Sequence, residues 1–193
     1  MKLVEELDSG PVYAGKEISI LSEDDRGSLE AKLAGLGSEL LISVLDGMGE
    51  APSPRKGEGG SGPLPQTQGG ITYCAKLTAG DERLRWTETS QSCWNRVRAF
   101  APAPGAHFSL PGGEICKVLK AQIYSPLPNP PPGKGGGTVG EVKGPGPDKG
   151  LLVACGGGGV LNLLQVRPAG KKDQNGSDLL NGKKVRVGDI LPS

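Results

Sequence analysis

The sequence has few of the residues on which metal sites, disulfide frameworks and aromatic cores depend. Its 193 residues include one histidine, and its four cysteines form no CxxC pair. This spacing gives no reason to expect a metal site, and it predicts small buried apolar cysteines in a reducing compartment. Aromatic residues make up only 4%, so the core is predicted to be mainly aliphatic. The cysteines are Cys74, Cys93, Cys116 and Cys155.

Long apolar runs are also lacking. No stretch approaches the roughly 18 consecutive apolar residues of a membrane-spanning helix, so no membrane partner is expected. The first ten residues, MKLVEELDSG, hold one lysine followed by acidic residues. That pattern differs from a signal peptide, which has a basic start and an apolar centre, and from an arginine-rich transit peptide.

Glycine and proline are abundant and clustered, with 33 and 17 residues respectively. Residues 51–70, APSPRKGEGGSGPLPQTQGG, have no periodic apolar pattern. They are predicted to be a linker between one domain in residues 1–50 and another in residues 71–193. Two further Gly/Pro-rich insertions, residues 126–137 and 143–150, are predicted to be long loops between strands.

Charge is divided unevenly along the chain. Residues 1–54 carry four basic and eleven acidic side chains, a net charge of −7. Residues 55–193 carry eighteen basic and ten acidic side chains, a net charge of +8. A basic half suggests a polyanionic partner. Two solvated surfaces of opposite sign explain the same numbers, and charge alone does not separate the two interpretations.

Apolar spacing predicts the elements of the first part. Residues 12–14 and 17–20 are expected to be strands. Residues 28–45 are expected to form an amphipathic helix, because their leucines and valine recur every three or four residues. Residues 1–50 contain few other strands, so we expect apolar surface to be exposed there.

The second part is predicted to contain one helix followed by several strands. Thr87 or Thr89 is expected to cap a helix in which Cys93, Trp94, Val97 and Phe100 form one face. Many short strands separated by glycine-rich turns are typical of a small β-barrel. The predicted strands are residues 71–77, 107–110, 115–124, 138–142, 151–155 and 160–166.

The last of these strands leads into a turn that contains two lysines. Pro168 and Gly170 are expected to end the strand, because proline cannot donate to a ladder and glycine admits turn dihedrals. Lys171 and Lys172 follow directly. They are either solvated or ready to bind an anion. A short helical turn is predicted next, with Ser177 as its N-cap and Gly182 as its C-cap.

From residue 71 onward the sequence resembles the C-terminal domain of the methionyl-tRNA formyltransferase family. The stretch RLRWT, residues 83–87, fits the family's R-I-D-W-S, and RAFAPAPGA, residues 98–106, fits R-A-F-x-P-W-P-G-A. GVLNLL at residues 159–164 fits G-x-L-x-L-L, PAGKK at residues 168–172 fits P-x-G-K-[KR], and DLLNG at residues 178–182 fits D-F-x-N-G.

The beginning of the chain is similar to the end of the same family's catalytic domain. LDSGP, residues 7–11, fits the L-D-[TAS]-G-[PD] turn, and residues 24–37 fit the helix that closes the domain. The resemblance implies an α/β remnant, the last strands and helix of a Rossmann-like formyltransferase domain. A C-terminal OB-like β-barrel with one helix would follow it.

The resemblance also implies a reaction, in which a formyl group passes from 10-formyltetrahydrofolate to the amino group of methionine on initiator tRNA. The family uses an Asn and a His to stabilise the oxyanion, and an Asp to orient the His and manage protons. Asp8 matches the Asp. The N-x-H segment that holds the other two groups, and the S-L-L-P folate loop that follows it, are absent, and His107 is not a match. Since Met1 fits an internal position of the family, we expect a truncated chain.

The implied partner is initiator methionyl-tRNA, and no metal cofactor is implied. The resemblance suggests tRNA contacts at Lys171 and Lys172, and near the linker at Arg55, Lys56 and Lys76. A solvated charge is the alternative at each position. The protein is expected to be a monomer of the cytoplasm or of an organelle matrix. Two rival functions remain: a non-catalytic or decayed RNA-binding product, and a related enzyme that uses formyltetrahydrofolate.

Overall fold

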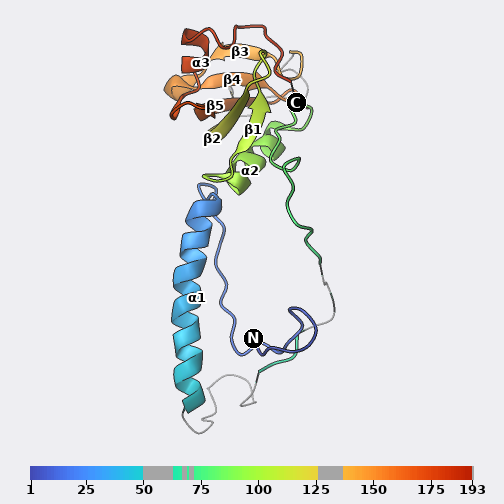
Figure 1. Ribbon diagram of the computed structural model, residues 1–193, viewed down its shortest axis with the longest axis vertical. Helices are drawn as coiled ribbons and strands as arrows, with labels where there is room; N and C mark the ends of the chain where they lie inside the picture. The colour runs from blue at the N-terminus through green and yellow to red at the C-terminus, as the bar shows by residue number, and fades with distance from the viewer. Residues whose placement is uncertain (50–62, 67–68, 70–71, 126–136, 193) are drawn as a thin grey trace. The chain divides into compact units, whose positions relative to one another are not determined.

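The computed structural model describes residues 1–49, 63–66, 69, 72–125 and 137–192 (Figure 1). Contacts between residues divide the chain into two compact units. The first unit comprises Met1–Glu23 and Ser28–Lys76, and the second comprises Asp24–Gly27 and Leu77–Ser193. Most of the predicted linker, residues 51–70, and most of the insertion at residues 126–137 lie outside the described residues.

The first unit contains most of one long helix. Helix α1, Arg26–Gly49, confirms the helix predicted for residues 28–45 and extends it at both ends. The strands predicted at residues 12–14 and 17–20 are wrong: Val12 makes a single bridge to Leu64, and residues 17–20 are irregular. A strand needs a neighbour along its length to pair its N–H and C=O groups, and the described part of this unit provides one only at Val12.

Apolar surface is exposed on this unit, as predicted for residues 1–50. Leu3 is 90% exposed and Leu7 is 96% exposed. Several apolar side chains of helix α1 are also exposed to solvent. The helix therefore buries less apolar area than an amphipathic helix usually does. The exposed residues of α1 include Leu33, Leu41, Ile42 and Leu45.

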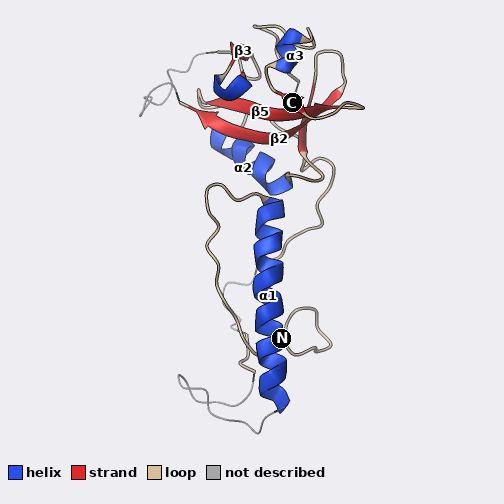
Figure 2. Cartoon of the chain, turned by 90° about the vertical axis from the view of Figure 1, so that its left-hand side faces the viewer, coloured by secondary structure: helices blue, strands red, loops and turns tan. Residues whose placement is uncertain are grey.

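The second unit is an antiparallel sheet of six strands with short helices (Figure 2). The strands follow the order β1-β2-β5-β4-β3, and β6 pairs with β5. Helix α2, Ser90–Phe100, precedes the sheet in sequence, and η1, Pro147–Lys149, and α3, Asp178–Asn181, lie in later connections. The strands are β1 Ala106–Ser109, β2 Ile115–Tyr124, β3 Val142–Pro145, β4 Leu151–Ala154, β5 Val160–Pro168 and β6 Gln174–Asn175.

The predicted barrel is not closed. Strands β1 and β3 lie at the two ends of the strand order, and no pairing between them is seen in the described ranges. The sequence did not predict η1 as an element of the unit, whereas α3 is the short helical turn predicted between Ser177 and Gly182. The sheet is therefore an open antiparallel one, bent around a core.

Two predicted strands differ from the structure. Residues 138–142 were expected to form a strand, but β3 begins only at Val142, because the preceding residues form a turn in which Glu141 N–H donates to Thr138 O (2.9 Å). The insertion at residues 143–150, expected to be a loop, instead forms most of β3 and all of η1. Residues 72–77 form no strand, and Tyr73 is 94% exposed.

Helix α2 starts at the cap that its sequence indicates. The Thr89 hydroxyl accepts a hydrogen bond from Ser92 N–H (3.1 Å), which satisfies one of the unpaired donors of the first turn. Cys93, Val97 and Phe100 are buried, as predicted. The fourth residue predicted on that face is Trp94. It is partly buried, and its Nε1–H donates to Ala121 O (3.1 Å).

Residues 24–27 belong to the second unit because they bind the end of α2. Gly27 N–H donates to Ala101 O (3.2 Å) and the Arg26 guanidinium donates to Ala103 O (3.0 Å). Arg98 donates to Asp24 O (3.1 Å) and lies over the Trp94 ring, 4.2 Å from its centroid. Arg98 therefore packs within this unit.

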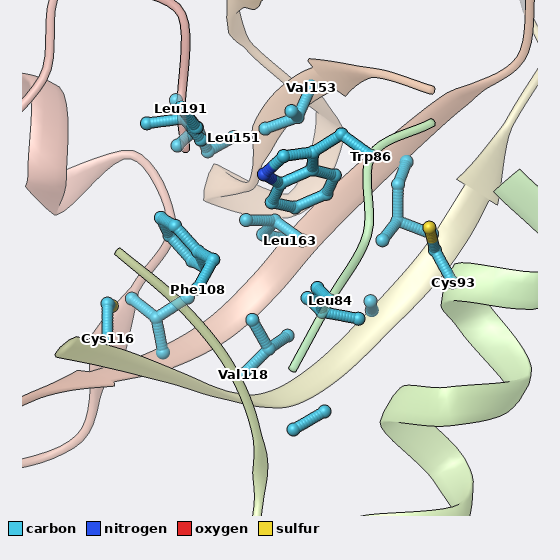
Figure 3. Close-up of a cluster of buried hydrophobic side chains, with 14 of the residues drawn as sticks. Leu84, Trp86, Cys93, Phe108, Cys116, Val118, Leu151, Val153, Leu163 and Leu191 are labelled. Carbon is cyan, nitrogen blue, oxygen red and sulfur yellow. The ribbon is translucent and has the colours of Figure 1, made fainter. Parts of the chain in front are cut away.

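The core of the second unit is mainly aliphatic, with the aromatic rings of Trp86 and Phe108 inside it and Phe100 also buried (Figure 3). Trp86 and Phe108 are fully buried and meet edge to face, with ring centroids 5.5 Å apart. Such a pair adds to the free energy gained from burial alone. Residues from the segment before α2, from α2 and from the sheet surround the rings, including Leu84, Cys93, Val118, Val153 and Leu163.

Three of the four cysteines are buried, and the prediction of burial is wrong for Cys74, which is exposed. Burial raises the pKa of the Cys116 thiol to about 12. The pKa of the Cys155 thiol is also raised, first by its hydrogen bond with the thiol of Cys93 and then by burial. Both groups therefore remain protonated at neutral pH.

Thiol labelling at pH 8 is expected to modify Cys74 alone in the folded chain. The reactive form is the thiolate, and Cys116 and Cys155 are held as buried thiols, while Cys93 is fully buried despite a lowered pKa. Mass spectrometry after maleimide treatment should give one adduct, rising to four in denaturant. Cys74→Ser should give none in the folded state, and rapid labelling of that variant would contradict the buried arrangement.

Candidate functional site: the Asp8 turn and the lysine turn

The backbone of the Asp8 turn, residues 7–11, restricts which residues can occupy two of its positions. Asp8 adopts a left-handed conformation (φ 54°), which aspartate tolerates better than most residues. Gly10 is buried, and a Cβ atom added there would lie 1.8 Å from Lys2 O. A residue with a side chain cannot occupy that position unless the first residues of the chain move. The Asp8 side chain is exposed.

The turn is held by backbone and side-chain hydrogen bonds. Lys2 N–H donates to Pro11 O (2.8 Å), and the Ser9 hydroxyl donates to Glu6 O (3.1 Å). The side-chain amide of Gln66 donates to Asp8 O (2.7 Å) and to Gly10 O (2.8 Å). Sequence reasoning missed Gln66, because it lies in a Gly/Pro-rich segment with no local pattern that indicates a role.

Asp8 is an exposed carboxylate on a turn, and it can accept a proton or a hydrogen bond. The one histidine of the sequence, His107, lies in β1 of the second unit, with Nδ1 3.9 Å from Glu82 Oε2. His107 lies in a strand of the sheet, and its backbone N–H donates to the backbone carbonyl of Glu82 (2.9 Å). Of the Asn, His and Asp that the family resemblance implies, the sequence contains a match for the Asp alone, at Asp8.

The lysine turn, residues 168–172, follows β5. Lys171 N–H donates to Pro168 O (3.0 Å), and Gly170 has a positive φ of 68°, so the turn is tight. Strand β5 ends at Pro168. Proline has no backbone N–H, so it cannot donate a further hydrogen bond to a neighbouring strand. Ser177 lies at the N-cap of α3, but its side chain makes no cap bond, whereas Gly182 is the C-cap as predicted.

Both lysines of this turn extend into solvent. The neighbouring carboxylate, Asp173, forms an ion pair with Arg167, whose Nη2 lies 3.0 Å from Asp173 Oδ2. Arg167 lowers the pKa of Asp173, mainly through this hydrogen bond. In the part of the chain that the structure describes, neither Lys171 nor Lys172 has an ion-pair partner. Their charges are therefore available to an anion.

The remaining predicted contact residues are placed only in part. Lys76 is exposed and belongs to the first unit. Arg55 and Lys56 lie outside the described residues. Within those ranges, no three His, Cys, Asp or Glu side chains gather as metal ligands would. Nor does any described helix have the length and apolar character needed to cross a membrane.

Solved structures share the fold at low sequence identity. HypX from Aquifex aeolicus matches 97% of this chain with a TM-score of 0.65 and 18% identity, and the match covers 30% of that chain. HypX in complex with tetrahydrofolic acid matches 98% of this chain with a TM-score of 0.63 and 16% identity, over 32% of its own length. At this identity the likeness describes the fold alone.

Curated relatives are similar over nearly the whole chain. The methionyl-tRNA formyltransferase of Dictyoglomus turgidum is 35% identical over 98% of this chain and 55% of its own length. That of Halorhodospira halophila is 36% identical over 98% of this chain and 55% of its own length. The methionyl-tRNA formyltransferase of Methylococcus capsulatus is 35% identical over 94% of this chain and 53% of its own length. The chain thus spans about half the length of the curated relatives it matches.

The family comparison covers most of the second unit. Residues 76–184 match the family described as formyl transferase, C-terminal domain. The match includes α2, strands β1 to β6 and the lysine turn, and it spans more than half of the chain. The chain belongs to the formyl transferase family, of which residues 76–184 form the C-terminal domain.

Proposed function

We propose that this chain is the C-terminal part of a methionyl-tRNA formyltransferase. The observation that carries the proposal is the similarity to enzymes of that name at 35% identity over 98% of the chain, a span that includes both the Asp8 turn and the lysine turn. The substrates would be 10-formyltetrahydrofolate and initiator methionyl-tRNA. No metal is invoked, because formyl transfer from an activated amide needs proton transfer and oxyanion stabilisation.

In the proposed reaction, the methionyl amine attacks the formyl carbon and the carbonyl oxygen becomes an oxyanion. The bond between the formyl carbon and the folate nitrogen then breaks, and the proton lost by the amine is passed to the folate nitrogen. Asp8 would accept or direct that proton through the histidine that it orients. The asparagine and histidine that stabilise the oxyanion in the family have no counterpart in this sequence, so this chain contributes Asp8 to the chemistry.

The second unit would bind tRNA. We infer that its sheet is an OB-like barrel left open between β1 and β3, with Lys171 and Lys172 contacting phosphates of the acceptor arm. Support comes from residues 77–193, whose 15 basic and 9 acidic side chains give a net charge of +6, and from the solvent-exposed lysine turn. Arg55, Lys56 and Lys76 are proposed as further contacts near the linker. The proposal includes a monomer in the cytoplasm or in an organelle matrix.

Binding of initiator tRNA to the 193-residue chain is expected to weaken steeply with salt. Each phosphate contact releases a counterion, with a slope of about −0.7 to −0.9 per contact in a plot of log K against log salt. The double variant Lys171→Ala/Lys172→Ala should therefore bind more weakly and with a slope shallower by about 1.4 to 1.8. Filter binding or fluorescence anisotropy across a salt series measures both quantities.

The matched control is Lys16→Ala/Lys32→Ala, which removes the same charge from the acidic part of the chain. It should leave the slope unchanged. Binding that does not respond to salt, or an equal loss in both double variants, would contradict the role of the lysine turn. A non-catalytic RNA-binding protein is the second candidate, favoured by the excess of basic residues in residues 55–193. It predicts the same binding without formyl transfer.

A further inference from the structure

The Asp8 turn presents two backbone carbonyls that converge on one point. Asp8 O and Gly10 O both lie within 2.8 Å of the same nitrogen, Nε2 of Gln66. Two carbonyl oxygens so placed repel each other unless a donor lies between them. A primary amide nitrogen carries two hydrogens, so Gln66 can donate one to each carbonyl.

Gln66 reaches this place because of a short antiparallel pairing. Val12 N–H donates to Leu64 O (2.8 Å), and Leu64 N–H donates to Val12 O (2.9 Å). In an antiparallel register, stepping two residues back from Val12 and two forward from Leu64 brings Gly10 opposite Gln66. The bridge therefore sets the side chain of Gln66 against the turn, although the two are 56 residues apart.

The start of the chain also contacts the turn. Lys2 N–H donates to Pro11 O, and Lys2 O lies so close to Gly10 that no Cβ would fit. Lys2 and the Gln66 amide thus both hold the turn, and the same amide nitrogen lies 3.6 Å from Met1 Sδ. The left-handed conformation of Asp8 is uncommon for a residue with a side chain, and it persists where surrounding contacts impose it.

We propose that Gln66 is a positioning residue for Asp8: by bridging the Asp8 and Gly10 carbonyls, its amide holds the turn in the shape that directs the Asp8 carboxylate to the reacting amine. The inference rests on the proposed function, since it gives Asp8 a role in formyl transfer. It also links that carboxylate to a segment inside the predicted linker, residues 51–70. A change in this segment would then alter the rate of the reaction.

The test compares Gln66→Met, which has similar length and no donor, with Gln66→Lys, which restores a donor. In formyl transfer from 10-formyltetrahydrofolate to initiator methionyl-tRNA, Gln66→Met should lower kcat by about 10-fold or more, within the roughly 100-fold that a 1 Å displacement of a reacting group costs. KM for tRNA should stay within about twofold of its original value, because no tRNA contact is removed. Gln66→Lys should recover most of the rate.

Gln91→Met is the matched control, since Gln91 binds Asn95 on α2 and does not contact the turn. It should leave kcat unchanged. Equal kcat for Gln66→Met and the parent protein would overturn the inference, as would a loss in Gln66→Met that appears only in KM. Asp8→Asn separates the two proposals: if it retains full activity, the role of Asp8 fails.

A second measurement decides the matter without activity. In carbonyl carbon NMR spectra of the 193-residue chain, Gln66→Met should shift the Asp8 and Gly10 resonances, because both carbonyls lose a donor. Gln66→Lys should shift them less, and Gln91→Met should leave them in place. If the full-length protein that contains this chain transfers no formyl group but these shifts occur, the bridge stands and the proposed function fails. If the resonances do not move, the bridge itself is refuted.

Discussion

Replacing Trp86 by alanine should lower the free energy of unfolding of the second unit by about 3 to 5 kcal/mol, the usual cost of removing a large aromatic side chain from a core. Trp86 is fully buried, and its ring meets that of Phe108 edge to face. Small domains are stable by only about 5 to 15 kcal/mol. The variant should therefore be close to unfolding at room temperature, as urea titration followed by far-UV circular dichroism would reveal.

Trp94→Ala is the control for this variant, because it makes the same substitution at the surface of the core. Trp94 is partly buried, donates to Ala121 O and lies beneath the Arg98 guanidinium. Its loss should cost about 1 to 2 kcal/mol, from one hydrogen bond and one cation–π contact. A Trp86→Ala variant no less stable than Trp94→Ala would show that Trp86 is not at the centre of the core.

Adding a single methyl group at Gly156 is expected to destabilise the second unit by about 3 kcal/mol. A Cβ atom there would lie 2.0 Å from Thr87 O and 2.7 Å from the Thr87 carbonyl carbon, both backbone atoms that cannot move aside alone. Gly156 N–H also donates to Trp86 O (2.7 Å) and Glu88 O (2.8 Å). Overpacking of this kind costs about 1 to 3 kcal/mol, and the weakened hydrogen bonds add about 1 kcal/mol.

Gly112→Ala provides the matched control for Gly156→Ala. No atom lies within 4 Å of a Cβ built at Gly112, in the turn between β1 and β2. The substitution should be neutral or stabilise by up to about 1 kcal/mol, because it reduces the freedom of the unfolded chain. Thermal unfolding of the two variants should differ by several degrees. Equal midpoints would mean that the segment before α2 does not pack against Gly156.

Features set by neighbouring residues were predictable from the sequence. The leucine spacing of α1, the Thr89 cap of α2 and the apolar run of β5 each depend on a few adjacent residues, and each was confirmed. The family was also within reach, because its motifs are short and occur in order. Asp8 was found through such a motif, and its assignment as a catalytic residue stays a prediction.

Features set by distant partners were not predictable. Residues 17–20 and 72–77 have strand-like composition but no strand, and β3 lies further along the chain than its composition suggested. A strand forms where another segment pairs with it, and composition does not name that segment. For the same reason, the exposure of Cys74 was not predicted. Its burial was expected from its residue type, although the segment around it is exposed.

By itself, the sequence determined that α1, α2 and α3 form, that α2 is capped by Thr87 or Thr89, and to which family the chain belongs, because these depend on residues close together along the chain. Tertiary structure alone decided that the sheet stays open between β1 and β3, and that Gly156 abuts the segment before α2. It also brought the Gln66 amide to the Asp8 turn. Those contacts join residues far apart in sequence, and only the folded backbone sets the distance between them.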